Sequence, residues 1–161
     1  MNSTNDAARQ MLRHALATVA YRGGKAIRGA PESFATFRLG DASRTSAQLL
    51  AHLGDLYDWG LSMAAGKQAW HDSVPLEWGR EVERFFDCLK KFDDYLASNA
   101  ALHAPIEGLF QGPVADSLTH IGQIAMMRRL AGCPIKAENY FKAEIITGRV
   151  GTKQAAPRQE F

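Results

Sequence analysis

The sequence predicts an all-α protein built as a four-helix bundle. Four long segments repeat apolar residues at spacings of three and four, which is the pattern of a helix that buries one face. Capping and stop signals of helices flank these segments, and no convincing series of strands accompanies them. Packing the four apolar faces against one another is the simplest way to remove them from water, so a bundle is the expected architecture.

The first two predicted helices differ in how they are delimited. The first runs from about Asn5 to Arg22, and the pair Gly23-Gly24 predicts its end. The second begins after Thr45, which stands three residues before Gln48. This is capping-box spacing, in which the hydroxyl and the amide each satisfy a free backbone donor at the start of a helix. The apolar pattern of this second helix continues to Gly66.

The third and fourth predicted helices are bounded by prolines and glycines. The third starts near Pro75, a favourable residue in a first helical turn, and runs to Asn99. The fourth opens at Gly112-Pro113 and ends at Gly132, with Pro134 just beyond. Both carry large apolar residues on one face, so both are expected to contribute to the core.

Two segments lie outside these helices. The connection from Gly23 to Arg44 is longer than most links between helices, and we expect Phe34 and Phe37 to pin it to the bundle. The stretch from Pro134 to Phe161 mixes aromatic and β-branched residues with glycines, which predicts an ordered arm over the bundle or over a neighbouring subunit. The expected organisation is one domain over residues 1–161, with a core at about 5–132 and a C-terminal arm at 133–161.

Composition and charge exclude several classes of protein. Apolar residues make up 46% and charged residues 22% of the 161 residues, which is close to the average of globular proteins and unlike disordered or collagen-like chains. The net charge of +2 is spread along the chain without a basic block, so no nucleic-acid partner is expected. No stretch is long and apolar enough for a membrane span or a secretory signal, and the two cysteines are isolated, so the expected location is the cytoplasm.

Three side chains on two of the helices form a candidate site. His52 lies beside the apolar stripe of the second helix, where it neighbours Leu49 and Leu56 on the helical wheel. Asp116 and His120 are four residues apart on the fourth helix, so they project from one face, and we expect this face to point toward the bundle interior. A buried ionised carboxylate requires a partner, because an unpaired charge is not tolerated in an apolar setting.

A divalent metal would supply that partner. Bundle cores commonly hold metals through carboxylates and histidines that project inward from facing helices. His52, Asp116 and His120 would provide two imidazoles and one carboxylate, which suits zinc with an open position of the catalytic type. The same set matches the two-histidine, one-carboxylate arrangement of non-haem iron, so the identity of the metal stays open.

The same residues allow an interpretation without metal. Asp116 falls in the first turn or so of the predicted fourth helix, where a carboxylate complements the helix dipole. His120 would then be a core imidazole that hydrogen-bonds to Asp116, and His52 an unrelated residue at the rim. Around the site, Gln123 is a candidate second-shell residue one turn from His120.

Two aromatic residues and one cysteine complete the set of candidates. Tyr57 and Trp59 are predicted to line the mouth of a pocket at the site. Trp59 belongs to a cluster of three tryptophans between residues 59 and 78, a pattern more typical of core or rim packing than of a ligand cage. Cys88 stands in the apolar stripe of the third helix and is interpreted as a small buried hydrophobe outside the site.

Two short motifs resemble a known family. The run from Asp116 to Ile124 (DSLTHIGQI), followed by MRRLAG at 127–132, resembles the last bundle helix of the DinB/YfiT-like superfamily. The run LLAHL at 49–53, which follows Thr45, resembles the second helix of that family with its metal-binding histidine. The resemblance covers residues from about 5 to 132. It implies an up-down-down-up four-helix bundle, usually a homodimer, with a divalent metal held by three side chains.

One position departs from the family pattern, which is three histidines, two of them as a His-x-x-x-His pair on the last helix. Asp116 stands at the first position of that pair, and a carboxylate there favours harder ions. The resemblance implies an enzyme that uses zinc, nickel or iron to activate water or a thiol, as a hydrolase or as a mycothiol- or bacillithiol-dependent S-transferase or isomerase. The alternative, motivated by Asp116, is a non-catalytic dimeric bundle that binds a small molecule or partner, with the metal absent or vestigial.

Overall fold

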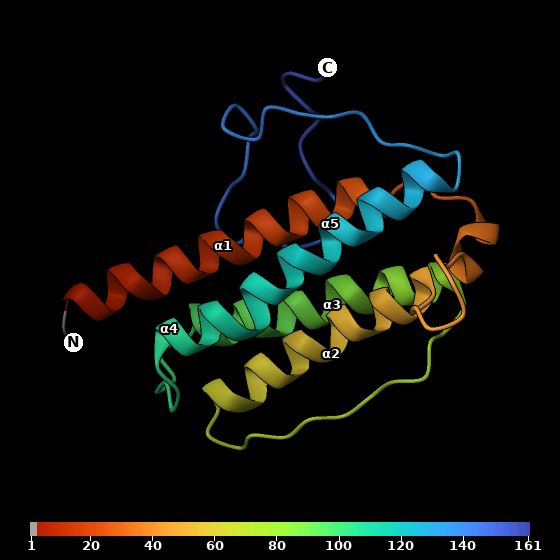
Figure 1. Cartoon of the computed structure of the whole chain (residues 1–161). Coiled ribbons are helices and arrows are strands. Elements are labelled where there is room, and N and C mark those ends of the chain that lie inside the picture. The colour runs from red at the N-terminus through yellow and green to blue at the C-terminus, as the bar shows by residue number, and fades with distance from the viewer. Residues whose placement is uncertain (1–2) are drawn as a thin grey trace.

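Four long helices carry the fold in the computed structural model, which describes residues 3–161 of the chain (Figure 1). They are α1 (Ser3–Ile27), α2 (Ser46–Ala64), α3 (Trp78–Ala97) and α5 (Ala115–Leu130). Three short elements accompany them: a 3-10 turn η1 (Glu32–Thr36), a helix α4 (Ile106–Leu109) and a π-helical turn η2 (Phe110–Val114). Over the described range there is no strand, so the prediction of an all-α protein is confirmed.

Helices α1 and α5 run in one direction, and α2 and α3 run in the other (Figure 1). The parallel course of α2 and α3 is visible in the hydrogen bond from the Tyr95 hydroxyl, near the end of α3, to the carbonyl of Ala64 at the end of α2 (3.2 Å). Because both helices point the same way, the loop at 65–77 has to return along the length of the bundle before α3 begins. This loop covers one side of α2 and becomes part of the candidate site.

Large apolar side chains from the long helices form one core. The most deeply buried of them come from the faces that the apolar spacing predicts, and they include Leu16, Leu50, Leu53, Phe85, Leu89, Phe92 and Ile124. On α1, the apolar spacing predicts that Met11 and Leu12 both belong to the inner face, but Met11 is exposed and only Leu12 is buried. The core therefore follows the predicted helical periodicity, with a small rotation of α1.

Helix α1 continues past the glycine pair that was expected to end it. It runs to Ile27, and the chain turns only at Gly29, whose φ of +66° is accessible mainly to glycine. The reason is close packing: a Cβ at Gly23 would lie 2.6 Å from Cζ of Phe85, and one at Gly24 would lie 3.3 Å from Cζ of Phe86. The two glycines thus let α3 approach α1 instead of stopping the helix.

The last helix also starts earlier than predicted. The chain is helical from Ile106, and Pro113 sits inside the π-helical turn η2 rather than at a helix start. A wider turn tolerates proline, because the backbone bonds there are already displaced from the regular i to i−4 pattern. The predicted end is confirmed, since Gly132 has a φ of +76° and the Cys133 amide donates to the Arg128 carbonyl (2.9 Å) in a Schellman-type cap.

The start of α2 and the connection before it agree with the prediction. The Gln48 amide donates to Oγ1 of Thr45 (3.2 Å), and the Thr45 amide donates to Oε1 of Gln48 (2.8 Å), which completes the capping box. In the connection, Phe34 is buried, stacks on Phe37 and meets the ring of Trp78 edge-on. These contacts hold the chain between α1 and α2 against the bundle.

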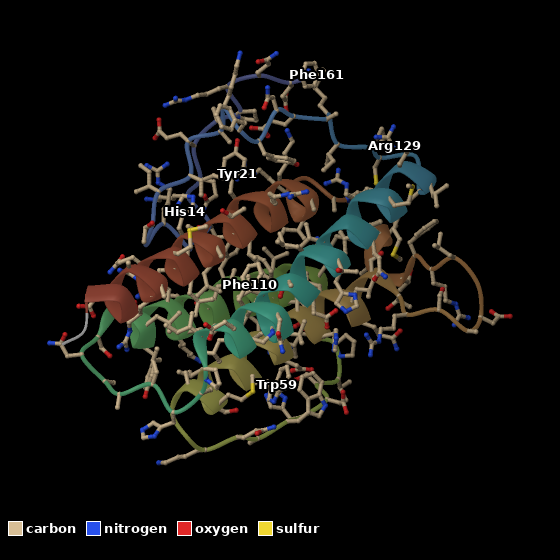
Figure 2. All side chains as sticks on the ribbon, turned by 60° about the vertical axis from the view of Figure 1, so that its left-hand side comes forward. His14, Tyr21, Trp59, Phe110, Arg129 and Phe161 are labelled. Carbon is tan, nitrogen blue, oxygen red and sulfur yellow. The ribbon has the colours of Figure 1, made fainter. Side chains whose placement is uncertain are left out.

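The arm at 133–161 lies over α1 (Figure 1). Glu138, whose side chain is fully buried, accepts hydrogen bonds from the Tyr21 hydroxyl (2.6 Å) and from Nζ of Lys25 (2.7 Å). Lys25 also bridges to Glu160 near the chain end (2.8 Å). Figure 2 shows Tyr21 and His14 on the side of α1 that faces the arm. A buried carboxylate with two partners is costly to separate, so the arm is held at its base.

Candidate metal centre

His52, Asp116 and His120 meet on one face of the bundle, where α2 and α5 cross. One ligand atom from each residue lies within 4.8 Å of the others. Nε2 of His120 is 3.6 Å from Oδ1 of Asp116, and Nε2 of His52 is 4.0 Å from Oδ2 of the same carboxylate. The two imidazole rings lie edge to face, with their centroids 4.8 Å apart.

The helical geometry explains why these residues converge. Asp116 and His120 are one turn apart on α5, so they share a face, and the antiparallel neighbour α2 brings His52 opposite them. Each ligand therefore sits on a regular helix rather than on a loop. Helices hold side chains in defined positions, which favours a site that is formed before anything binds.

The donor set fits a divalent transition metal. Three ligand atoms at about 2.0–2.2 Å from a zinc ion in tetrahedral geometry lie roughly 3.4 Å from one another. The separations from the Asp116 carboxylate to the two imidazoles, 3.6 and 4.0 Å, exceed this by about half an ångström or less, and all three ligand atoms lie within 4.8 Å of one another, so side-chain rotations can bring them to one ion. Two neutral imidazoles and one carboxylate suit zinc, nickel or iron and leave coordination positions for another ligand.

Gln123 orients one of the imidazoles. Oε1 of Gln123 lies 2.8 Å from Nδ1 of His120. An amide oxygen accepts, so this contact places the ring hydrogen on Nδ1 and leaves the lone pair of Nε2 toward Asp116 and His52. Metal-binding histidines commonly donate a hydrogen bond from their second ring nitrogen in this way, and the prediction that Gln123 hydrogen-bonds to a ligand agrees with the contact.

His52 is held in the neutral form that binds metals. Burial lowers its pKa, and the nearby positive charge of Arg44 and the His120 ring lower it further, while Asp116 acts in the opposite direction. A neutral imidazole offers a lone pair, whereas a protonated one offers none. At neutral pH the nitrogen of His52 is therefore available as a ligand.

The structure weakens the interpretation without metal. Asp116 does not stand at a free helix start, because η2 and α4 precede α5 without a break and the Ala115 amide already donates to carbonyls of η2. The helix dipole thus offers little there. The closest approach of Asp116 to His120, at 3.6 Å, is also too long for a direct hydrogen bond. The carboxylate of Asp116 is 46% exposed, however, so water can solvate it, and the expectation that burial forces it to find a partner is wrong.

The site is less buried than the sequence predicts. The side chains of His52 and His120 are 14% exposed, whereas that of Asp116 is 46% exposed. The face of α5 that carries them points to the rim of the α2–α5 contact rather than into the core, where Ser117, Ile121 and Ile124 stand instead. An open rim leaves a small molecule free access to the three ligands.

Two clefts flank the ligands, and Arg44 lines both of them. The cleft on the His120 side has a volume of about 370 Å³ and is walled mainly by apolar side chains: Leu39, Leu49, Met126 and Met127. The cleft on the His52 side measures about 430 Å³ and is more polar, with Gln48, Asp55, Asp72 and Ser73. Both volumes fall in the range of small-molecule sites.

The two predicted pocket aromatics lie elsewhere. Tyr57 is wholly buried, with its ring against Phe85, so the expectation that it lines the mouth is wrong. It stands on the face of α2 that points into the core, opposite to the solvent side of the site. Trp59 contacts Trp70 edge-on, at 5.9 Å between centroids, and it is Trp70 that meets the ring of His52 at 5.6 Å. Trp59 therefore packs against Trp70, and it is Trp70 that contacts the candidate metal ligand His52.

A buried charge network fixes the loop beside His52. Asp55, one turn after His52, is only 2% exposed and accepts from the Ser73 amide (2.9 Å), the Ser73 hydroxyl (2.7 Å) and the guanidinium of Arg84. Burial by itself would raise the pKa of Asp55, but the hydrogen bonds from Ser73 and Arg84 outweigh it and lower the pKa. His71, which belongs to the same loop as Ser73, places its Nδ1 3.1 Å from Oδ1 of Asp55. These contacts fix the loop at 65–77, which holds Trp70 against the ring of His52.

Sequence reasoning missed Arg44, Trp70 and Asp55 as neighbours of the ligands. Asp55 follows His52 by three residues on a predicted helix, so helical spacing alone could have placed it near the site. No local pattern marks Arg44 or Trp70, because each reaches the site from a connecting segment. The interpretation of Cys88 is in accord with the structure: burial raises the pKa of its thiol to about 12, with Asp58 adding to the effect, so the thiol stays protonated.

Comparison of the chain with protein-family models, with curated proteins and with solved structures gives no match. Among residues 3–161, no helix combines the length and the apolar character needed to cross a membrane.

Proposed function

We propose that the protein is a divalent-metal-dependent enzyme whose metal is held by His52, Asp116 and His120. The observation that carries this proposal is the convergence of three ligand atoms from two helices to within 4.8 Å. The neutral state of His52 and the orienting contact from Gln123 support it, because both prepare nitrogen lone pairs for a cation. The open rim and the two adjoining clefts provide room for a substrate.

The proposal includes membership of the DinB/YfiT-like superfamily. What supports this is the order of helix directions, with α1 and α5 opposed to α2 and α3, together with the placement of the ligands on the second and last long helices. On this basis the proposed reaction is hydrolysis or transfer to a low-molecular-weight thiol. Zinc, nickel and iron remain the proposed metals.

The chain's own residues would perform defined tasks in such a reaction. His52 and His120 would bind the cation through their Nε2 atoms, and Asp116 would bring one negative charge to it from the solvent side. Gln123 would keep the His120 hydrogen on Nδ1. A bound divalent cation supplies Lewis acidity, which lowers the pKa of a coordinated water or thiol toward neutrality. The loop at 65–77, held by Asp55, would keep Trp70 over His52 and shield it from water.

Metal binding is the direct test. We would measure the metal content of freshly purified protein by elemental analysis, and then titrate zinc, nickel and iron(II) into chelator-treated protein by calorimetry. One ion per chain is expected. His120→Ala and His52→Ala should each weaken binding more than Gln123→Ala does, and loss of a supporting residue of that kind usually costs about tenfold to a hundredfold in affinity.

The matched control is His14→Gln, which changes a histidine on the far side of α1 that bonds to Thr147. It should bind metal as the unaltered protein does. The proposal fails if purified protein holds no stoichiometric metal and the chelator-treated protein, although folded, binds none of the three ions. It also fails if the ions bind equally well to His52→Ala and His120→Ala.

Catalysis needs a second test, with the metal-loaded protein. Hydrolysis of activated esters and transfer of a small thiol to 1-chloro-2,4-dinitrobenzene, with release of chloride and a proton, represent the two proposed reactions. Turnover should appear on adding metal and disappear in His120→Ala. Metal binding without turnover in either reaction would favour the alternative, a non-catalytic bundle that binds a small molecule or partner.

We also propose that the protein is a homodimer. Large apolar side chains of the arm are exposed, including Phe141 at 96% and Phe161 at 73%, and association would bury surface of this kind. Sedimentation velocity at micromolar concentration should show a dimer. Observation of monomer alone would remove this part of the proposal and leave the metal site untouched.

A further inference from the structure

We propose that the cleft on the His120 side binds an amphipathic monoanion, with its acidic group on Arg44 and its apolar body against the methionine wall. The inference names a substrate class for the proposed enzyme and rests on that function. It makes its own demand on the structure, however, because the binding of the acidic group depends on Arg44 and not on the metal ligands.

The apolar half of the cleft is formed by two exposed side chains and by two that belong to the core. Leu39 is 60% exposed and Met126 54% exposed, and they line the cleft together with the buried Leu49 and Met127. Exposed apolar side chains around a concavity are typical of ligand sites, because a ligand that covers them removes apolar surface from water. Methionine is flexible and polarisable, so it adapts to aliphatic or aromatic bodies.

The charge in the cleft comes from Arg44. Arg44 is an exposed residue that lines the cleft, and its guanidinium has no acidic side chain within ion-pair distance in the described part of the chain. Arg44 lines one cleft together with His120 and the other together with His52. Arg44 therefore lies next to the ligands with its hydrogen-bond donors free for a carboxylate, which a guanidinium can hold in a fork.

The other lining groups restrict the head group to a single charge. Ser43 and Gln123 add hydrogen-bonding groups, but no lysine and no second arginine line this cleft. A phosphate group with two charges commonly calls for more than one cation. In the neighbouring cleft on the His52 side, Asp55 and Asp72 oppose an anion, so the acidic group is directed to the His120 side. A bound monoanion would thus lie with its first carbons beside His120.

Octanoate, 1-octanol and octylamine provide matched probes, because they share a chain length and differ in head-group charge. We would titrate each into the purified protein by calorimetry, and repeat the titrations after chelator treatment so that direct ligation of the carboxylate by a metal is separated from binding to Arg44. Octanoate should bind at least about tenfold more tightly than 1-octanol, with or without chelator, and octylamine most weakly.

Two variants and a control decide the role of the arginine. Arg44→Gln should remove the preference for octanoate over octanol, and Arg44→Lys should keep part of it. Arg80→Gln removes an exposed positive charge on α3 that does not line the cleft, and it should leave the preference for octanoate unchanged. Met126→Gln should weaken octanoate and octanol alike, because it alters the wall that both probes share.

Each remaining outcome overturns the inference. Equal affinity for octanoate and octanol would show that no acidic group is recognised. A preference that survives in Arg44→Gln would place the acidic group elsewhere, and a preference that vanishes on chelation of the unaltered protein would place it on a metal. Arg44→Gln should still bind one metal ion per chain when metal binding is measured separately, because Arg44 supplies none of the three ligand atoms. Failure of this inference is therefore distinguishable from failure of the proposed metal site.

Discussion

Replacing Gly23 by alanine should destabilise the protein, although it removes a glycine from the middle of a helix. The new methyl group would lie 2.6 Å from Cζ and 3.3 Å from Cε1 of Phe85, and 3.2 Å from Cδ1 of Ile121. Phe85 is fully buried, so its ring has little room to withdraw. Overpacking of this kind costs about 1–3 kcal/mol, while the gain in helix propensity is about 1 kcal/mol. The free energy of unfolding should therefore fall by about 1 kcal/mol.

Gly122→Ala is the matched substitution on α5. This glycine also stands inside a helix, but a Cβ there would meet no atom within 4 Å. Only the gain in propensity remains, so the free energy of unfolding should rise by about 1 kcal/mol. The two variants make the same chemical change and are predicted to shift stability in opposite directions.

Urea denaturation followed by far-UV circular dichroism measures both variants. For a chain of this size, a change of 1 kcal/mol moves the midpoint of thermal unfolding by about 2–4 °C, so the thermal scan provides a second readout. If Gly23→Ala stabilises the protein as much as Gly122→Ala does, the close contact between α1 and α3 is not what keeps alanine out of position 23, and the explanation of the uninterrupted α1 fails.

Three further predictions concern stability and the arm. Asp55→Asn should lower the free energy of unfolding by about 3 kcal/mol at pH 7, because it removes one of the two buried carboxylates that pair with the half-buried guanidinium of Arg84, the other being Glu81. Since the pKa of Asp55 is lowered in the folded protein, this contribution is complete above the unfolded-state pKa of about 4 and is lost as the pH falls below it. Urea titrations at several pH values should therefore show that the difference in free energy of unfolding between the unaltered protein and Asp55→Asn shrinks in acid. A difference that does not depend on pH would contradict this. Thr45→Ala should cost about 1 kcal/mol by removing the cap of α2, whereas Thr45→Ser should cost less. Glu138→Ala should speed tryptic cleavage in the arm, and unchanged cleavage would show that the arm does not depend on this buried carboxylate.

The long helices could be predicted because their signals are local. The capping box of Thr45 and Gln48, the glycine at 132 and the apolar spacing each depend on residues within a few positions of one another. The two errors at helix boundaries have another origin. Gly23 is tolerated inside α1 because of Phe85, which is 62 positions away, and Pro113 is tolerated inside a helix because the turn around it is π-helical. Neither cause is visible in the local sequence.

The candidate site divides in the same way. The relation of Asp116 to His120 follows from helical spacing, and the approach of His52 follows once α2 and α5 are neighbours. The apolar pattern alone could not show whether Tyr57 is buried or exposed, because this residue lies only one turn from residues at the rim of α2. Arg44 and Trp70 come from connecting segments whose paths depend on the tertiary fold, so no periodic signal announces them.

The π-helical turn η2 determines the rotational phase of α5. Such a turn acts as the insertion of one residue into an α-helix, and one residue rotates everything that follows by about 100°. If that residue were deleted while α4 stayed in place, Asp116 and His120 would swing away from His52, although all three would still be in the chain. A search for this site in other sequences therefore has to count the residues between Pro105 and Asp116, since possession of the ligands by itself does not guarantee that they meet.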